Sequence, residues 1–327
     1  MVERAGIPRV AVVGSGYWGR NLVRVLAEAG ALGAVVDRDP ERAAEQAALH
    51  SSVALGWEEV LADQRFDAVV IAAPAVQHGA LALEAIAAGK HVFVEKPLSL
   101  DVAQAEAVCA AAEAAGRVLM VGHLLQYHPG FLELHRLVDE GALGKVHYVY
   151  SNRLNLGKFR REENILWSFA PHDVSMILAL VGEEPVSVSA VGGWYLSDDV
   201  ADVTTTHMAF PGGARAHVFV SWLHPYKEQR LVVVGDEAMA VFDDGRPWSE
   251  KLVLYAHRVD MTGEVPEPVR ADAAPVTLDE REPLAEEMRH FLECVTSGET
   301  PRTDGREGVR VLRVLHEAEE SLAGGRA

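Results

Sequence analysis

Positive charge and cysteine are both scarce in this chain of 327 residues. Asp and Glu number 48 against 30 Lys and Arg, which gives a formal net charge of −18. An acidic surface of that size repels nucleic acid and anionic lipid, so we expect neither a nucleic acid nor a membrane as a partner. The two cysteines, Cys109 and Cys294, lie far apart and without CxxC spacing, so we expect no structural zinc or other metal site.

The sequence also lacks a long apolar run. Hydrophobic residues make up 49% of the chain, yet no stretch approaches the roughly 20 apolar residues of a membrane-spanning helix. The N-terminus leads directly into a strand pattern without the features of a signal peptide, so we expect a cytoplasmic protein. The length suits two domains, each with its own core.

Residues 1–122 alternate short apolar, β-branched runs with Ala-rich segments of helical length. This alternation predicts an α/β domain of the Rossmann type, a doubly wound parallel sheet with helices on both faces. The predicted strands are Arg9–Val13, Leu32–Val36, Ala68–Ile71, His91–Val94 and Val118–Val121, and the helices between them include Gln77–Ala88 and Asp101–Ala115.

Residues 123–327 change in character and predict an α+β domain with a large, open and mainly antiparallel sheet. Short turns such as Pro211-Gly212-Gly213 suit antiparallel pairing. The predicted strands are Val146–Asn155, Val186–Tyr195, Thr204–Phe210, Ala214–Leu223, Arg230–Phe242 and Lys251–His257, and the predicted helices are His123–Val138, Asn164–Val181, Pro283–Thr296 and Gly308–Leu322. The two C-terminal helices are candidates for packing back on the first domain.

A glycine-rich turn, Gly14-Ser15-Gly16-Tyr17-Trp18-Gly19, follows the first predicted strand and opens a helix. Its first glycine permits a tight turn, its second lets the backbone approach a pyrophosphate, and its third lets the helix pack closely on the strand. The helix N-terminus adds partial positive charge. In this context the turn, with Tyr17 and Trp18 inside it, predicts dinucleotide binding rather than a purely structural bend.

Asp37 ends the second predicted strand, 21 residues after Gly16. A carboxylate there can accept both hydroxyls of an adenosine ribose and would repel a 2′-phosphate, which favours NAD over NADP. The neighbouring Arg38 keeps NADP open as the alternative, because its guanidinium could stack on adenine or pair with that phosphate.

Two further segments follow the next predicted strands. Because ligands bind beyond the carboxyl ends of the strands in an open parallel sheet, we expect both segments to face the cofactor. The first segment supplies Ala73, Pro74 and His78, and the second supplies Glu95 and Lys96. His78 could equally cap a helix. A lysine at the position of Lys96 could contact the nicotinamide ribose and a substrate hydroxyl.

These motifs carry a resemblance that spans nearly the whole chain. The glycine-rich turn, the stretch AIAAGKHVFVEKPL ending at Leu98, and the later Pro171-His172-Asp173 resemble the glucose-fructose oxidoreductase / inositol dehydrogenase / MocA (Gfo/Idh/MocA) family. The resemblance implies an NAD(P) domain and a substrate domain whose open sheet faces the active site or a partner subunit. It also implies that Lys96 and His172 are the catalytic residues.

One position departs from the family pattern. The family commonly has an Asp four residues before the histidine, where this chain has Ser168. Serine cannot supply the negative charge that stabilises an imidazolium, and Asp173 points roughly 100° away around a helix. This departure leaves open a different class of function, a non-catalytic NAD-binding sensor or scaffold.

The segments Asn164–Asp173 and Ser221–Lys227 most resemble nucleotide-sugar 3-dehydrogenases that act on UDP-N-acetylglucosamine or its uronic acid. The expected function is therefore NAD(P)-dependent oxidation of a secondary ring hydroxyl of a sugar, the 3-hydroxyl of a UDP-linked N-acetylhexosamine or its uronate. A dehydrogenase of a free sugar or cyclitol is the alternative, and the lack of cations for a diphosphate would favour it.

Candidate substrate contacts lie at the start of the second half and near these segments. Tyr127 resembles residues that line the family's substrate cleft, and arginines would suit a diphosphate, although packing or a solvated face explains each residue as well. The candidates are Tyr127, Asn152, Arg153, Arg161, Trp167 and Asp173. The second half offers more sheet face than one helix layer covers, so we expect a homodimer or homotetramer.

Overall fold

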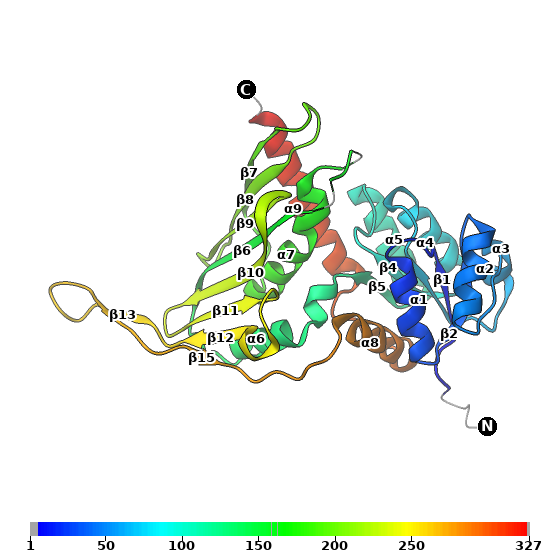
Figure 1. Ribbon diagram of the computed structural model, residues 1–327, viewed down its shortest axis with the longest axis horizontal. Helices are drawn as coiled ribbons and strands as arrows, with labels where there is room; N and C mark the ends of the chain where they lie inside the picture. The colour runs from blue at the N-terminus through cyan, green and yellow to red at the C-terminus, as the bar shows by residue number, and fades with distance from the viewer. Residues whose placement is uncertain (1–5, 158, 162, 326–327) are drawn as a thin grey trace. The chain divides into compact units, whose positions relative to one another are not determined.

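Five short apolar strands form a parallel sheet in the first half of the chain (Figure 1). In the computed structural model, which describes residues 6–157, 159–161 and 163–325, the strand order is β2-β1-β3-β4-β5. The strands are β1 Val10–Val13, β2 Leu32–Val36, β3 Ala68–Ile71, β4 His91–Glu95 and β5 Leu119–Gly122. Nearly all of their side chains are buried, as parallel strands covered on both faces require. The predicted Rossmann architecture is confirmed.

Helices connect these strands, and several begin or end where the sequence supplies a cap. They are α1 Gly19–Glu28, α2 Pro40–Leu49, α3 Trp57–Ala62, α4 His78–Ala87 and α5 Val102–Ala115. Asp39 caps α2 by accepting from the backbone N–H groups of Glu41 and Arg42, and Asp101 caps α5 in the same way. Gly116 ends α5 in the left-handed region, with a φ of 60°.

The chain returns to this sheet near its end. Residues up to Tyr127 and the segment Glu282–Leu312 form one unit, which contains α8 Pro283–Ser297 and the first part of α9 Gly305–Gly324. Apolar residues three and four apart on α8 enter the core, and the Phe291 ring meets Phe93 of β4 edge to face at 5.8 Å. The first unit therefore contains more than residues 1–122, the domain expected from the sequence, because α8 supplies part of its core.

The second unit comprises His128–Arg281 and the residues from Arg313 onward, and it contains an eight-stranded sheet. Its strand order is β15-β12-β11-β10-β6-β9-β8-β7, antiparallel except for the β6–β9 pair. The main strands are β6 Val146–Leu156, β7 Ser187–Gly193, β8 Val203–Ala209, β9 Arg215–Ser221, β10 Leu223–Gly235, β11 Met239–Asp243 and β12 Leu252–Tyr255, with β13 Arg258–Asp260, β14 Glu267–Val269 and β15 Ala274–Pro275 following. The predicted open, mainly antiparallel sheet is confirmed.

The helices of the second unit, α6 Pro129–Asp139, α7 Ile165–Val181 and the end of α9, pack on one face of this sheet (Figure 1). Side chains alternate along the strands between this covered face and a face that carries no described helix. None of the helices in the described part of the chain combines the length and apolar character that a membrane crossing needs.

One predicted strand is wrong. The segment Arg230–Phe242 is not continuous but crosses a hairpin between β10 and β11. Residues 236–238 form the turn, where the Asp236 carboxylate accepts the backbone N–H of Lys145 at 2.8 Å. A Cβ on Gly235 would lie 1.9 Å from the carbonyl oxygen of Leu143, so only glycine fits. The apolar residues on both sides of the turn made the segment look like one strand, because the contacts that impose the turn come from another part of the chain.

We expect Phe291→Ala to destabilise the first unit by about 3–5 kcal/mol, because the ring is fully buried against Phe93 and its removal leaves a cavity. Urea unfolding measures the loss. Glu293→Ala on the exposed side of α8 is the control, with an expected change within about 0.5 kcal/mol. Equal effects of the two variants would contradict the role given to α8.

Candidate functional site

Close backbone contacts fix the glycine-rich turn between β1 and α1. Gly14 has a φ of +92°, and a Cβ there would lie 2.6 Å from the carbonyl oxygen of Ala72. A Cβ on Gly19 would lie 1.9 Å from the carbonyl oxygen of Gly14. Gly16 has no such neighbour within 4 Å and faces open space. The turn thus presents bare backbone at the start of α1, which fits the pyrophosphate of a dinucleotide.

A pocket of about 540 Å³ opens beside this turn, and all of its lining residues belong to the first unit. Its walls come from the carboxyl ends of β1, β2 and β3, the edge at which doubly wound sheets bind ligands. Six of the predicted cofactor residues line it, namely Gly14, Gly16, Asp37, Arg38, Ala73 and Pro74. The structure therefore brings together the predicted contacts for adenosine and pyrophosphate.

Asp37 lies in this pocket wall with its side chain only 5% exposed, and Arg42 of α2 holds it with two hydrogen bonds. The Arg42 guanidinium donates to Oδ1 at 2.7 Å and to Oδ2 at 3.1 Å. Burial alone would raise the pKa of Asp37, but donors from Arg42, Asp39 and Ser15 hold this pKa well below its ordinary value. Sequence reasoning missed Arg42, because the bend at Asp39 brings it back to the strand end.

His78, the first residue of α4, connects two loops of the cofactor edge. Its ring is buried, with Nδ1 2.7 Å from the carbonyl oxygen of Pro97 and Nε2 2.8 Å from that of Ala73. Burial lowers the pKa of His78, against the raising effect of its contacts with Pro97 and Ala73. His78 therefore holds the loop after β3 to the Glu-Lys-Pro turn.

Glu95, the last residue of β4, connects that turn to the glycine-rich turn. The indole N–H of Trp18 donates to Glu95 Oε1 at 2.5 Å, whereas Tyr17 beside it is 76% exposed. Burial raises the pKa of Glu95 to about 7, against the lowering effect of Trp18 and of the neighbouring Lys96. The predicted residues Trp18 and Glu95 thus form one contact, and Lys96 follows directly at the same strand end.

A buried polar cluster follows β5, and sequence reasoning missed most of it. His123 Nδ1 lies 2.5 Å from Glu307 Oε2, and the Gln126 amide donates to Glu307 Oε1 at 3.1 Å. The Tyr127 hydroxyl bonds Thr303 Oγ1 at 2.9 Å inside the hydrophobic core, and burial raises the pKa of Tyr127 above its ordinary value. Tyr127, proposed from the sequence as a substrate contact, is placed here within the first unit.

Glu287 of α8 is a second acid buried in this region, with 0% of its surface exposed. Neither of its carboxyl oxygens meets a hydrogen-bond donor among the described residues. Glu287 lies one helical turn before Phe291, and Glu95 lies two residues after Phe93 on its strand. Because the two rings pack on each other, each acid lies beside one member of this aromatic pair. Burial, followed by the charge of Glu95, raises the pKa of Glu287 well above its ordinary value.

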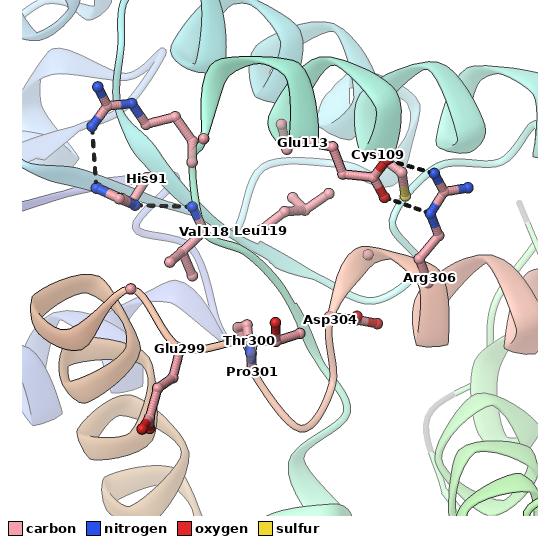
Figure 2. Close-up of a pocket in the computed structure, with 15 residues that line it drawn as sticks. His91, Cys109, Glu113, Val118, Leu119, Glu299, Thr300, Pro301, Asp304 and Arg306 are labelled. Carbon is pink, nitrogen blue, oxygen red and sulfur yellow. Dashed lines mark hydrogen bonds and ion pairs between the residues drawn. The ribbon is translucent and has the colours of Figure 1, made fainter.

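A second pocket of the first unit, with a volume of about 330 Å³, lies at the opposite edge of the sheet (Figure 2). His91 and Leu119, at the amino ends of β4 and β5, form part of its wall. Figure 2 shows the Arg306 guanidinium pairing with Glu113, at 2.6 Å, while His91 accepts the backbone N–H of Val118. The Arg306 and Glu113 side chains thus pair within the pocket wall, and the carboxyl edge, where the glycine-rich turn lies, is the candidate site.

Helix α7 of the second unit carries the predicted catalytic histidine. The Asn164 side chain caps its start by accepting the backbone N–H of Trp167. Glu319 of α9 then accepts from the Asn164 amide at 2.8 Å and from the Trp167 indole at 3.1 Å. Ser168 and His172 follow four residues apart on one helical face, and both are half-buried. Glu319, which sequence reasoning missed, therefore fixes the start of the helix.

Asp173 points from α7 to the covered face of the sheet, where its carboxylate is fully engaged. The Arg153 guanidinium donates to it at 2.6 and 3.1 Å, and the Ser151 hydroxyl donates at 2.5 Å. Asn152, one residue along β6, points to the other face and donates to Glu228. Arg161 is exposed. The proposed substrate contacts Asn152 and Arg153 therefore lie on opposite faces of one sheet.

The glycine-rich turn, its pocket and Asp37 define an NAD-binding Rossmann domain. Residues 8–123 match a family model described as an oxidoreductase family with an NAD-binding Rossmann fold, and residues 131–241 match the GFO/IDH/MocA C-terminal domain. The chain belongs to the Gfo/Idh/MocA family, and it is an NAD-dependent oxidoreductase. Among the described residues, no group of three or more His, Cys, Asp or Glu could hold a metal ion.

Several relatives are similar over nearly the whole chain. UDP-N-acetylglucosamine 3-dehydrogenase of Acidithiobacillus ferrooxidans is 31% identical over 306 residues, which cover 93% of this chain and 94% of that protein. A solved structure of that enzyme has a TM-score of 0.86 at 29% identity and covers 97% of both chains. The scyllo-inositol 2-dehydrogenase (NAD(+)) of Bacillus subtilis is 28% identical over 311 residues, covering 90% and 87%. GenD2 from gentamicin A biosynthesis, in complex with NAD, has a TM-score of 0.82 at 28% identity and covers 100% and 98%.

We expect Glu287→Gln to stabilise the protein increasingly as the pH rises. The pKa of native Glu287 lies above its ordinary value of 4.5. The contribution of this residue to the free energy of unfolding is therefore fully present below pH 4.5 and is lost as the pH rises toward the native pKa. Glutamine stays neutral throughout. The free energy of unfolding of the variant should therefore rise relative to that of the wild type by up to about 1.4 kcal/mol per pH unit. Urea unfolding at about pH 5 and pH 8 measures this difference.

Glu293→Gln, on the exposed side of α8, is the matched control and should show the same small difference at both pH values. A Glu287→Gln effect that is flat or declines with pH would mean that this acid is charged in the native state.

Proposed function

We propose that this protein oxidises a secondary ring hydroxyl of a sugar, specifically the 3-hydroxyl of a UDP-linked N-acetylhexosamine or its uronate, with NAD as the hydride acceptor. The similarity along nearly the whole chain to a UDP-N-acetylglucosamine 3-dehydrogenase supports this substrate. The NAD-binding turn and pocket of the first unit support the redox chemistry.

Two side chains carry the acid–base chemistry in this proposal. His172 removes the hydroxyl proton, because histidine is the side chain that most readily accepts a proton near neutral pH. Lys96 donates a hydrogen bond to the same oxygen and offsets its developing negative charge. Bound NAD supplies the acceptor for the hydride. Ser168 supplies no charge to the imidazolium, so the base function rests on His172 itself.

A second candidate function is the oxidation of a free sugar or cyclitol. The similarity to scyllo-inositol 2-dehydrogenase favours it, and the engagement of Arg153 by Asp173 leaves that cation less available to a diphosphate. A panel of UDP-sugars, free sugars and inositols, tested with NAD by following NADH formation, separates the two. Turnover confined to inositols or free sugars would overturn the nucleotide-sugar assignment.

We expect Lys96→Ala and His172→Ala each to reduce turnover by about 10²-fold or more while the protein still folds and binds NAD, the scale of a lost acid–base group. Ser168→Asp should leave turnover within about tenfold of the wild type, or raise it, since a carboxylate there would favour the imidazolium. Initial rates on the active sugar of the panel measure all three.

His147→Ala, at an exposed position of the second unit, is the control and should keep wild-type turnover. If His172→Ala turns over like the control, the base lies elsewhere and this mechanism is wrong.

We infer further that the open face of the eight-stranded sheet is covered in a homodimer or homotetramer. Tyr150 and His217 stack there with ring centroids 5.4 Å apart, and Val232 and Val241 pair beside them. The side chains of this face are polar at its rim, where Arg230 pairs with Asp243. A mixed apolar centre with a charged rim is typical of a subunit interface.

Light scattering should therefore give a mass of two or four times 35.4 kDa. Val241→Arg should lower that mass to that of one chain, because an unpaired charge would enter the centre of the interface. Far-UV circular dichroism checks that the variant is folded. A single-chain mass for the wild type at micromolar concentration would reject the assembly.

A further inference from the structure

The Asp37 carboxylate in the cofactor pocket already has more donors than it can use. Oδ2 receives the backbone N–H of Ser15 at 2.7 Å, the Ser15 hydroxyl at 2.9 Å and Arg42 Nε at 3.1 Å. Oδ1 receives the backbone N–H of Asp39 at 2.9 Å and Arg42 Nη2 at 2.7 Å. Five donors thus address about four lone-pair sites. A ligand hydroxyl can therefore donate a hydrogen bond to Asp37 only if one of these donors gives up its own.

Arg42 is the donor most able to yield. The N–H groups of Ser15 and Asp39 are fixed by the backbone, and the Ser15 side chain is buried. The Arg42 side chain is 44% exposed and reaches Asp37 from the first turn of α2. An adenosine ribose that bonds Asp37 therefore competes with Arg42, while the guanidinium remains beside the carboxylate and the ribose.

The charge at this position is also different from that of a free carboxylate. An isolated Asp37 would repel a 2′-phosphate, but the bidentate pair with Arg42 is neutral overall. Once displaced by the ribose, the guanidinium presents two or more N–H donors to whatever group occupies the 2′ position. Arg38 also lines the pocket and is exposed like Arg42, but within the described residues no hydrogen bond or ion pair joins it to Asp37, so Arg42 is the cation that pairs with this carboxylate.

We propose that Arg42 determines how this site discriminates between NAD and NADP. It neutralises Asp37 and binds the 2′-phosphate of NADP, and it competes with the ribose hydroxyls of NAD. The inference rests on the NAD-binding role of the first unit and is independent of which sugar the protein oxidises.

Titration calorimetry of the full-length, cofactor-free protein with NAD and with NADP tests this role. Arg42→Gln should weaken NADP binding and leave NAD binding equal or tighter, so that the ratio of the two dissociation constants shifts toward NAD by about tenfold or more. Arg42→Lys keeps the charge and should keep the ratio within about threefold of the wild type.

Arg65→Gln is the matched control, because Arg65 forms the same kind of bidentate pair with Asp63 outside the pocket. The ratio of the dissociation constants for NAD and NADP should stay within about twofold of the wild type in this control. In Arg38→Gln the same ratio should stay within about threefold. An unchanged ratio in Arg42→Gln, an equal loss of both cofactors, or a shift produced by Arg38→Gln alone would overturn the proposal. So would a wild-type protein that binds neither dinucleotide. Failure to oxidise any sugar, with both cofactors still bound, would overturn only the proposed function.

Discussion

The packing of Phe291 on Phe93 is the contact on which the cofactor edge depends, because it returns the end of the chain to the first sheet. The segment Glu282–Leu312 then completes the core and partners the residues that follow β5. Glu307 reaches His123, and Thr303 reaches Tyr127. A segment with no cofactor motif of its own therefore sets the environment in which the Glu-Lys-Pro turn lies.

Burial raises the pKa of both Asp37 and Glu287, and hydrogen-bond donors decide whether the net shift is downward or upward. Asp37 is buried among donors, so its charged form is favoured and its pKa falls. Glu287 is buried without a donor, so its neutral form is favoured and its pKa rises.

In the second unit, hydrogen bonds from distant segments orient the helix that carries His172. Glu319 fixes the start of α7 through the Trp167 indole, and Arg153 holds Asp173 against the sheet. Because a helix is rigid over four residues, these two anchors also fix the face on which Ser168 and His172 lie. Asp173 thus serves to attach the helix, and its carboxylate is committed to that contact.

The alternating strands and helices, the glycine-rich turn and the placement of Asp37 at a strand end can all be predicted from the sequence, because each depends on neighbours only a few residues apart. Which side chains meet at the cofactor edge depends instead on contacts between distant segments. His123 and Glu307 are 184 positions apart, and no local periodicity reports such a pair. Even the contact between Arg42 and Asp37, five residues apart, could not be predicted from the sequence, because it depends on the direction in which the chain turns between β2 and α2. The same holds for the hairpin after Gly235, where the backbone of Leu143 imposes the turn.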